Sequence, residues 1–161
     1  MSNFQVGFAG LTHLGLNYLA ASAEKGFKSI GFDFDKKKIN KLKKSFIDYK
    51  EPNLEKIIKK NKKKIFFTTN LIDLKKCHIV FISQDVQTDG RGDSYYYNLK
   101  KLVKKTSKFL NKKAIMVILS QIQPGFTRNI RFDKKRLYYQ VETLIFGNAL
   151  QRALFPERII I

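Results

Sequence analysis

Cysteine is nearly absent from this sequence, since Cys77 is the one thiol in 161 residues. A single cysteine excludes an internal disulfide and is typical of a reducing compartment. Long apolar runs are also absent, because none approaches the roughly 18–20 residues that a membrane-spanning helix needs. No Lys or Arg precedes the first apolar stretch, and Asn3 and Gln5 interrupt it, so no signal peptide is expected. These absences predict a cytoplasmic protein with no membrane partner.

Acidic residues are scarce: 13 Asp and Glu stand against 32 Lys and Arg, for a net charge of +19. Such an excess is compatible with a nucleic-acid or other polyanionic partner. However, 26 of the basic residues are lysine, placed where helices should face solvent, and only six are arginine. Arginine is the residue favoured for bidentate contacts with phosphates and bases. We therefore expect solvated helix surfaces and no specific nucleic-acid site, and keep a basic polyanion-binding protein as an alternative function.

Glycine is also sparse, with nine in the chain, but two of the nine bracket an informative turn. Residues 4–9 form a short apolar run, the turn spans residues 10–15, and residues 14–27 have helical spacing. A strand, a glycine turn and a helix together present backbone N–H groups to a phosphate. The usual pattern is Gly-x-Gly-x-x-Gly, and here Thr12 stands in place of the middle glycine, between Gly10 and Gly15.

An acidic residue follows the turn at an informative distance. Residues 28–33 read as a second strand that ends in Asp33, which lies 23 residues after Gly10. A spacing of about 20 residues is the one at which an acid meets the ribose hydroxyls of a bound adenosine. An acid there also repels a 2′-phosphate, which favours NAD over NADP. The alternative is that Asp33 only closes a strand-end turn or caps a helix.

The rest of the chain alternates between strand and helix patterns. Strands are expected at residues 65–68, 78–83, 114–119 and 136–141, and an apolar strand-like segment at 158–161. Helices are expected at residues 36–46, 51–61 and 95–113, with helical turns at 70–76 and a loop at 84–94. Phe46 and Phe109 are expected on inner helix faces, and Pro52 in a first turn. This alternation predicts an α/β fold: a Rossmann-like, doubly wound, mainly parallel sheet with helices on both faces.

Several further segments match patterns that occur together, and in this order, in one protein family. With the family's pattern in parentheses, which this chain follows only in part, they are residues 31–35 (Gly-Tyr-Asp-x-Asp), 49–54 (Tyr-Glu-Pro-Gly-Leu, with one extra residue here), 66–70 (Phe-Thr-Thr-Asp), 80–88 (Val-Phe-Ile-x-Val-Gly-Thr-Pro-Thr), 120–127 (Ser-Thr-Val-Pro-Pro-Gly-Thr-Thr), 139–147 (Tyr-Asn-Pro-Glu-Phe-Leu-Arg-Glu-Gly) and 155–159 (Asn-Pro-Glu-Arg-Ile). With the glycine turn, they cover nearly the whole chain. The sequence resembles the N-terminal NAD-binding domain of the UDP-glucose/GDP-mannose dehydrogenase family, the nucleotide-sugar 6-dehydrogenases.

The resemblance implies a cofactor, NAD, and a set of site residues. The implied cofactor-binding residues are Gly10, Thr12, His13, Leu14, Gly15, Asp33, Lys38 and Thr88. The implied catalytic residues are Glu142 and Gln121, and the implied substrate-binding residues are Glu142, Leu144 and Gly147. No metal site is expected. Glu142 would orient or deprotonate water during thioester hydrolysis, and its alternative role is a strand-end acid paired with a lysine.

The chain also departs from the family pattern. Thr12 replaces a glycine, and residues 85–87 replace Gly-Thr-Pro. Gln121 stands where the family uses a threonine near the nicotinamide and the catalytic water. Val141 and Phe146 replace a proline and the second glutamate of their segment. The family's catalytic cysteine lies in a later domain, so Cys77 is expected to be a core residue.

Residues 1–161 are therefore expected to be one NAD-binding domain, without the family's central and C-terminal domains. The implied function is the NAD-binding portion of an enzyme that oxidises the C6 alcohol of an NDP-sugar to a carboxylate, inactive as this chain alone. The full-length family implies a possible homodimer. The alternative is a non-catalytic, nucleotide-binding remnant or subunit.

Overall fold

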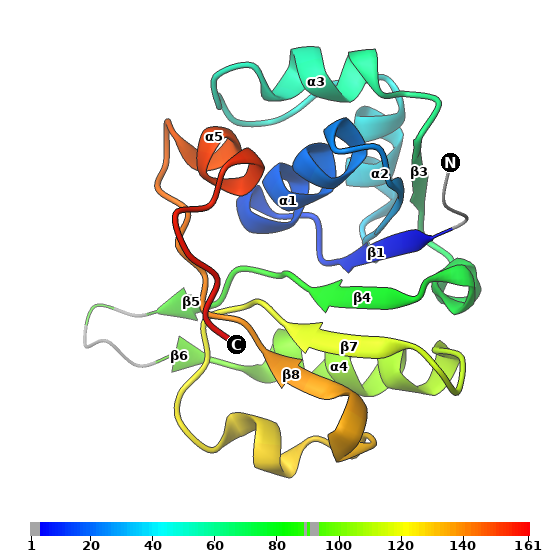
Figure 1. The fold of residues 1–161 in the computed structure, drawn as a ribbon, viewed down its shortest axis with the longest axis vertical. Coiled ribbons are helices and arrows are strands. Elements are labelled where there is room, and N and C mark those ends of the chain that lie inside the picture. Colours follow the sequence, from blue (N-terminus) through cyan, green and yellow to red (C-terminus); the bar gives the residue numbers. More distant parts are fainter. Residues whose placement is uncertain (1–3, 89, 91–93) are drawn as a thin grey trace.

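A computed structural model describes residues 4–88, 90 and 94–161, and its centre is a six-stranded parallel sheet. The strand order is β3-β2-β1-β4-β7-β8, so the chain returns to the middle of the sheet and places β4 beside β1 (Figure 1). The strands are β1 Gln5–Ala9, β2 Lys28–Phe32, β3 Ile65–Thr68, β4 Ile79–Ile82, β7 Ile115–Ile118 and β8 Leu137–Tyr139. This order confirms the predicted Rossmann-like fold, in which ligands bind at the carboxyl ends of the strands.

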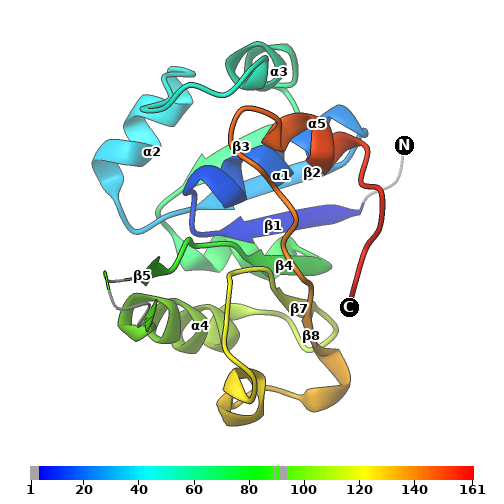
Figure 2. The same cartoon turned by 90° about the vertical axis from the view of Figure 1, so that its left-hand side faces the viewer.

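Helices cover both faces of this sheet, as predicted. They are α1 His13–Glu24, α2 Lys36–Lys43, α3 Leu54–Lys60, α4 Tyr97–Phe109 and α5 Ala149–Leu154, with 3-10 helices Leu71–Lys76, Phe126–Asn129 and Lys134–Arg136. One apolar core joins α1, α2, α3 and α5 to β1, and a second core joins α4 to β4 and β7. The sheet lies between α1 and α4 (Figure 2). Within the described residues, no helix has the length and apolar composition to cross a bilayer.

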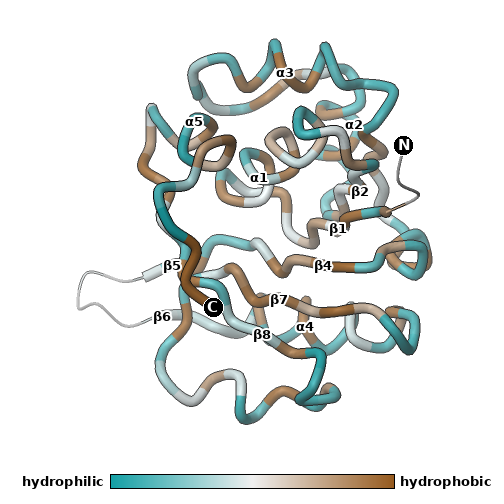
Figure 3. Tube along the Cα trace, viewed as in Figure 1, coloured by the Kyte–Doolittle hydropathy of each residue, from teal (hydrophilic) through white to brown (hydrophobic). Residues whose placement is uncertain are grey.

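The side chains of β1 show how one strand serves both cores. Val6 and Phe8 point into the core with α1, whereas Ala9 belongs to the core with α4. Successive residues of a strand point to opposite faces, so both faces must be apolar when both are covered. Figure 3 shows the same contrast along the chain, with apolar colouring on β4 and β7 and mostly hydrophilic colouring on α3.

Two predicted inward-facing aromatic residues are in fact exposed. The helix expected to reach Phe46 ends at Lys43, because Ser45 adopts a left-handed φ of 60°. Phe46 is 56% exposed and packs under the Lys41 ammonium, 5.5 Å from the ring centroid. Phe109 is the last residue of α4 and is 39% exposed. At Phe46 the apolar periodicity runs past the end of the helix, whereas Phe109 lies within α4 but at its exposed last turn.

Three local predictions were also wrong. Pro52 precedes α3 instead of lying in its first turn, because Asn53 takes a left-handed φ of 62° and the helix begins at Leu54. Within the described part of the chain, the apolar segment 158–161 joins no sheet, and Ile160 O accepts a backbone hydrogen bond from Val141 N (2.9 Å). The expected loop 84–94 holds a short antiparallel pair, β5 Gln87–Thr88 and β6 Ser94–Tyr95. Residues 89 and 91–93 of that loop lie outside the described residues.

Cys77 is a fully buried core residue between the first 3-10 helix and β4. Burial, reinforced by the charge of Asp73, raises the pKa of the Cys77 thiol to about 12. The thiolate is the nucleophile, so we expect the folded chain not to react with Ellman's reagent at pH 8. In guanidinium chloride, one equivalent of thiol should react within minutes. Rapid reaction of the folded chain would contradict this burial.

Candidate functional site

The turn between β1 and α1 can be built only with glycine at its two ends. Gly10 has a φ of +94°, and a Cβ there would lie 2.8 Å from the backbone nitrogen of Gln84. A Cβ on Gly15 would lie 2.1 Å from the carbonyl oxygen of Gly10. Helix α1 therefore presses against the turn that precedes it, next to the segment that follows β4.

Thr12 takes the place of the middle glycine without backbone strain. Its φ is −83° and its ψ −171°, an extended conformation that suits a β-branched residue at a helix N-cap. Its hydroxyl donates to the carbonyl oxygen of Ser83 (3.1 Å) and accepts from the backbone nitrogen of Asp85 (3.0 Å). The Thr12 side chain thus ties the turn to the segment after β4.

The N-terminus of α1 offers backbone amides to an anion. The first helical bond runs from Leu16 N to Thr12 O (3.0 Å), so the amides of His13, Leu14 and Gly15 precede the helical pattern. No acidic residue lies in this first turn. The helix dipole places partial positive charge there, which favours an anion such as a pyrophosphate. The Leu14 side chain is buried, so only its backbone faces the turn.

Asp33 lies at the end of β2 and is tied to the glycine turn. Its Oδ2 accepts from Leu11 N (3.0 Å) and from Lys38 Nζ (2.8 Å), and its Oδ1 accepts from Asp35 N (3.0 Å). The Asp33 side chain is only 13% exposed. Asp33 therefore closes the turn at the end of β2, as the alternative predicted, and it does so at the position expected for ribose recognition.

A cavity of about 350 Å³ lies at the carboxyl ends of β1 and β2, beside α4. Its lining residues are Gly10, Thr12, Asp33, Phe34, Asp35, Lys38, Gln84, Asn98, Lys101, Leu102 and Lys105. Four predicted cofactor residues, namely Gly10, Thr12, Asp33 and Lys38, thus share one cavity. Thr88 is exposed in β5 and does not line it. Sequence reasoning missed the α4 lysines, because a lysine facing a cavity looks like any solvated lysine.

His13 points away from this cavity and towards Glu51. Its Nε2 lies 2.8 Å from Glu51 Oε2, and its ring stacks on Phe146 with centroids 3.9 Å apart. Tyr49 contacts the same ring edge-on. The structure thus places the predicted cofactor residue His13 in a cluster that joins the glycine turn to the segment after β8.

Glu51 is a further residue that the sequence analysis did not assign. Its side chain is 1% exposed, and it accepts hydrogen bonds from Gly147 N (3.1 Å) and Ala149 N (2.9 Å) as well as meeting His13. Burial raises the pKa of Glu51, but the bonds from His13, Gly147 and Ala149 outweigh burial and hold it below its usual value. Glu51 is therefore a buried anion that fastens two loops to each other.

The two predicted catalytic residues lie side by side. Gln121 follows β7, Glu142 follows β8, and Gln121 Nε2 donates to Glu142 Oε2 at 3.2 Å. The other Glu142 oxygen accepts from the backbone nitrogen of Leu144. Among the described residues no ion pair joins a lysine to Glu142. Gly147, with a φ of +81°, ends the same connection.

Tyr18 of α1 lies close to this pair. Burial raises the pKa of the Tyr18 phenol, the nearby Glu142 charge raises it further, and hydrogen bonds with Thr143 and Gln140 partly offset both effects. The phenol therefore stays protonated at neutral pH beside the Glu142 carboxylate. No signal in the sequence distinguished Tyr18 from the other helix residues around it.

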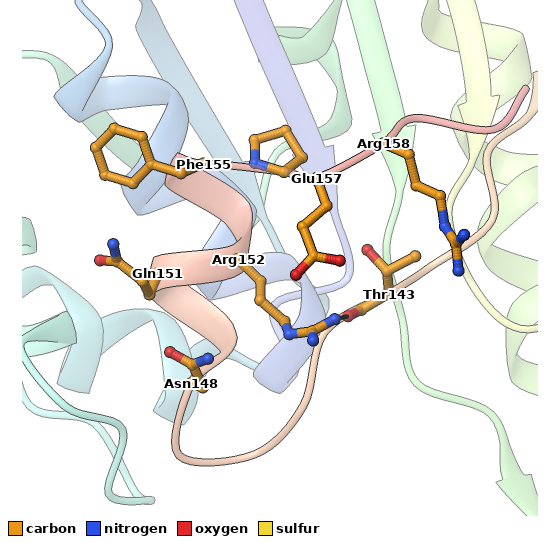
Figure 4. A pocket seen from close by; sticks show the side chains of 8 residues that line it. Thr143, Asn148, Gln151, Arg152, Phe155, Glu157 and Arg158 are labelled. Carbon is orange, nitrogen blue, oxygen red and sulfur yellow. Dashed lines mark hydrogen bonds between the residues drawn. The ribbon is translucent and has the colours of Figure 1, made fainter.

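A second, smaller cavity of about 180 Å³ lies between α5 and the chain that follows it. Figure 4 shows Arg152 reaching from α5 towards Thr143, whose carbonyl oxygen accepts from Arg152 Nη1 at 3.2 Å. None of the predicted site residues lines this cavity. The hydrogen bond from Arg152 ties the connection that carries Glu142 to α5.

Comparisons with known proteins agree with this geometry. Residues 4–161 match the model of the UDP-glucose/GDP-mannose dehydrogenase family, NAD binding domain. The putative UDP-glucose 6-dehydrogenase YtcA of Bacillus subtilis is 28% identical over 161 residues, covering 94% of this chain and 38% of YtcA. The UDP-glucose 6-dehydrogenase of Rickettsia typhi is 28% identical over 163 residues, covering 96% of this chain and 38% of that enzyme.

Solved structures show the same fold. The GDP-mannose dehydrogenase of Pseudomonas aeruginosa superposes with a TM-score of 0.83 at 18% identity, over 94% of this chain and 39% of that one. A UDP-glucose dehydrogenase from Pyrobaculum islandicum gives 0.83 at 19% identity, over 97% of this chain and 40% of that one. The chain thus spans well under half the length of these relatives. It belongs to the UDP-glucose/GDP-mannose dehydrogenase family, of which it is the NAD-binding domain.

Proposed function

We propose that this chain forms the NAD-binding site and one wall of the substrate cleft of a nucleotide-sugar 6-dehydrogenase. The reaction is oxidation of the C6 alcohol of an NDP-sugar to a carboxylate. The observation that carries the proposal is the single cavity shared by Gly10, Thr12, Asp33 and Lys38 at the carboxyl ends of β1 and β2. Ligands of open α/β sheets bind at this edge.

The residues present fit NAD at the pyrophosphate and at the ribose. The amides of His13–Gly15 would receive the pyrophosphate, and the carboxylate of Asp33 would accept a hydrogen bond from a ribose hydroxyl. NAD supplies the hydride acceptor when it is bound. Thr12 would support NAD binding indirectly, by fixing the glycine turn, because its hydroxyl is hydrogen-bonded to the Ser83 carbonyl and the Asp85 backbone nitrogen.

Gln121 and Glu142 would act on water at the neighbouring strand ends. The amide nitrogen of Gln121 orients the Glu142 carboxylate at 3.2 Å, and a carboxylate can accept a proton from a water molecule that attacks a thioester. The thiol that carries the thioester is not Cys77, which is buried. Another part of the enzyme must therefore supply the nucleophile.

Calorimetry with NAD tests the cofactor proposal on the chain as it stands. We expect NAD to bind, and Asp33→Asn to weaken binding about tenfold, because a charge-assisted hydrogen bond contributes about 1.5–3 kcal/mol. Asp48→Asn removes an exposed carboxylate paired with Lys41 and is the control, which should leave affinity unchanged. Absence of NAD or NADH binding at millimolar concentration would refute the proposal. The chain alone should not oxidise any NDP-sugar.

A nucleotide-binding subunit without turnover is the competing function. It is favoured by Phe146, which replaces a family glutamate and stacks on the His13 ring. The two proposals differ in what happens when the family's other domains are supplied to this chain from the same genomic neighbourhood. Recovery of NDP-sugar oxidation would establish the catalytic proposal, and NAD binding without recovery would favour the subunit.

A further inference from the structure

The proposed NAD-binding cavity carries more positive than negative side chains, although Asp33 lies in its wall. Its wall holds Asp33 and Asp35 against Lys38, Lys101 and Lys105, an excess of one positive charge. Two of the three lysines come from α4, which faces the ends of β1 and β2 across the cavity. The wall therefore carries net positive charge, which attracts an anionic ligand.

The hydrogen-bonding capacity of Asp33 is largely used within the protein. A carboxylate has about four lone-pair sites. Leu11 N and Lys38 Nζ occupy Oδ2, and Asp35 N occupies one site on Oδ1. One site remains, so Asp33 can receive one ribose hydroxyl but not a pair while these bonds persist. The contact with Lys38 at 2.8 Å also offsets the negative charge that would repel a phosphate.

The α4 lysines form one face of the helix. Asn98, Lys101 and Lys105 are three and four residues apart, which places them on the same side, with Leu102 between them. Lys105 Nζ lies 5.0 Å from the ring centroid of Phe34, the residue directly after Asp33. This contact brings a cation from α4 to the end of β2, where the adenosine ribose of a Rossmann fold binds.

We propose that the adenosine end of this cavity accepts a 2′-phosphate, so that the chain binds NADP as well as NAD. The proposal rests on the proposed function, since it assumes that the cavity is the cofactor seat. Lys38, Lys101 and Lys105 act as point charges on the phosphate, as lysine does at other phosphate sites. This revises the sequence-based expectation that Asp33 selects NAD against NADP.

The test is calorimetric titration of the full chain with NAD and with NADP. The two affinities should lie within about tenfold of each other, whereas uncompensated like charges would cost several kcal/mol, or more than about a hundredfold. The double variant K101Q/K105Q should weaken NADP about tenfold and NAD less than about threefold. NADP binding should also fall more steeply with salt than NAD binding.

The matched control is K100Q/K104Q, which removes the same two charges from the part of α4 that does not line the cavity. It should leave both affinities unchanged. NAD binding with NADP more than a hundredfold weaker would overturn the inference and leave the proposed function standing. An equal loss of NADP affinity in both double variants would also overturn it, since the effect would then be general charge. If neither nucleotide binds, the proposed function fails with it.

Discussion

Replacing Gly15 by alanine should lower the free energy of unfolding by about 3 kcal/mol, near the upper end for overpacked sites. The new Cβ would lie 2.1 Å from the Gly10 carbonyl oxygen and 2.7 Å from the Ser83 hydroxyl. The first of these neighbours is backbone, held between β1 and β2 by the bond from Gly10 N to Phe32 O (2.9 Å). Helix α1 can relieve the clash only by moving away from the sheet.

Urea denaturation followed by circular dichroism measures this loss. Gly90→Ala is the control, because among the described atoms none lies within 4 Å of a Cβ built at Gly90. The control should change stability by less than about 0.5 kcal/mol, as expected for an unconstrained surface position. Equal stability of the two variants would mean that α1 does not press on the turn as described.

Replacing Glu51 by glutamine should destabilise the fold by about 2 kcal/mol. The carboxylate accepts from Gly147 N and Ala149 N on its two oxygens and also meets His13 Nε2. Glutamine offers a single oxygen, and its NH2 group would face a backbone N–H. At least one buried donor would therefore lose its partner, and the loops after β1 and β8 would no longer be fastened together.

The loss should depend on pH in a defined direction. The pKa of Glu51 is lowered on folding, so its stabilising effect is present above the unfolded-state pKa of about 4.3 and disappears as pH falls through the folded value. The stability difference between wild type and Glu51→Gln should therefore shrink from about pH 5 towards pH 3. Glu55→Gln, at an exposed carboxylate paired with Lys59, is the control and should cost less than about 0.5 kcal/mol. A pH-independent difference would contradict the buried-anion role.

The sequence predicted the fold because its signals are local. Short apolar runs followed by amphipathic helices require a parallel sheet with covered faces, and Gly10 and Gly15 are needed wherever such a turn packs this closely. Errors occurred where periodicity continued past a left-handed residue, as at Ser45 before Phe46. The sequence analysis named Gln121 and Glu142 separately, and the pairing of β7 with β8 brings them together.

What the sequence by itself determined is therefore the architecture and the edge of the sheet at which the site lies. Only the tertiary structure decided which polar and charged groups become partners. Glu51 lies 38 residues from His13 and 96 from Gly147, and no local pattern selects such partners. The same holds for Lys105, which α4 brings to the end of β2. A hydrogen bond or charge pair depends on atoms meeting within a few ångströms, and that is decided by how whole elements pack.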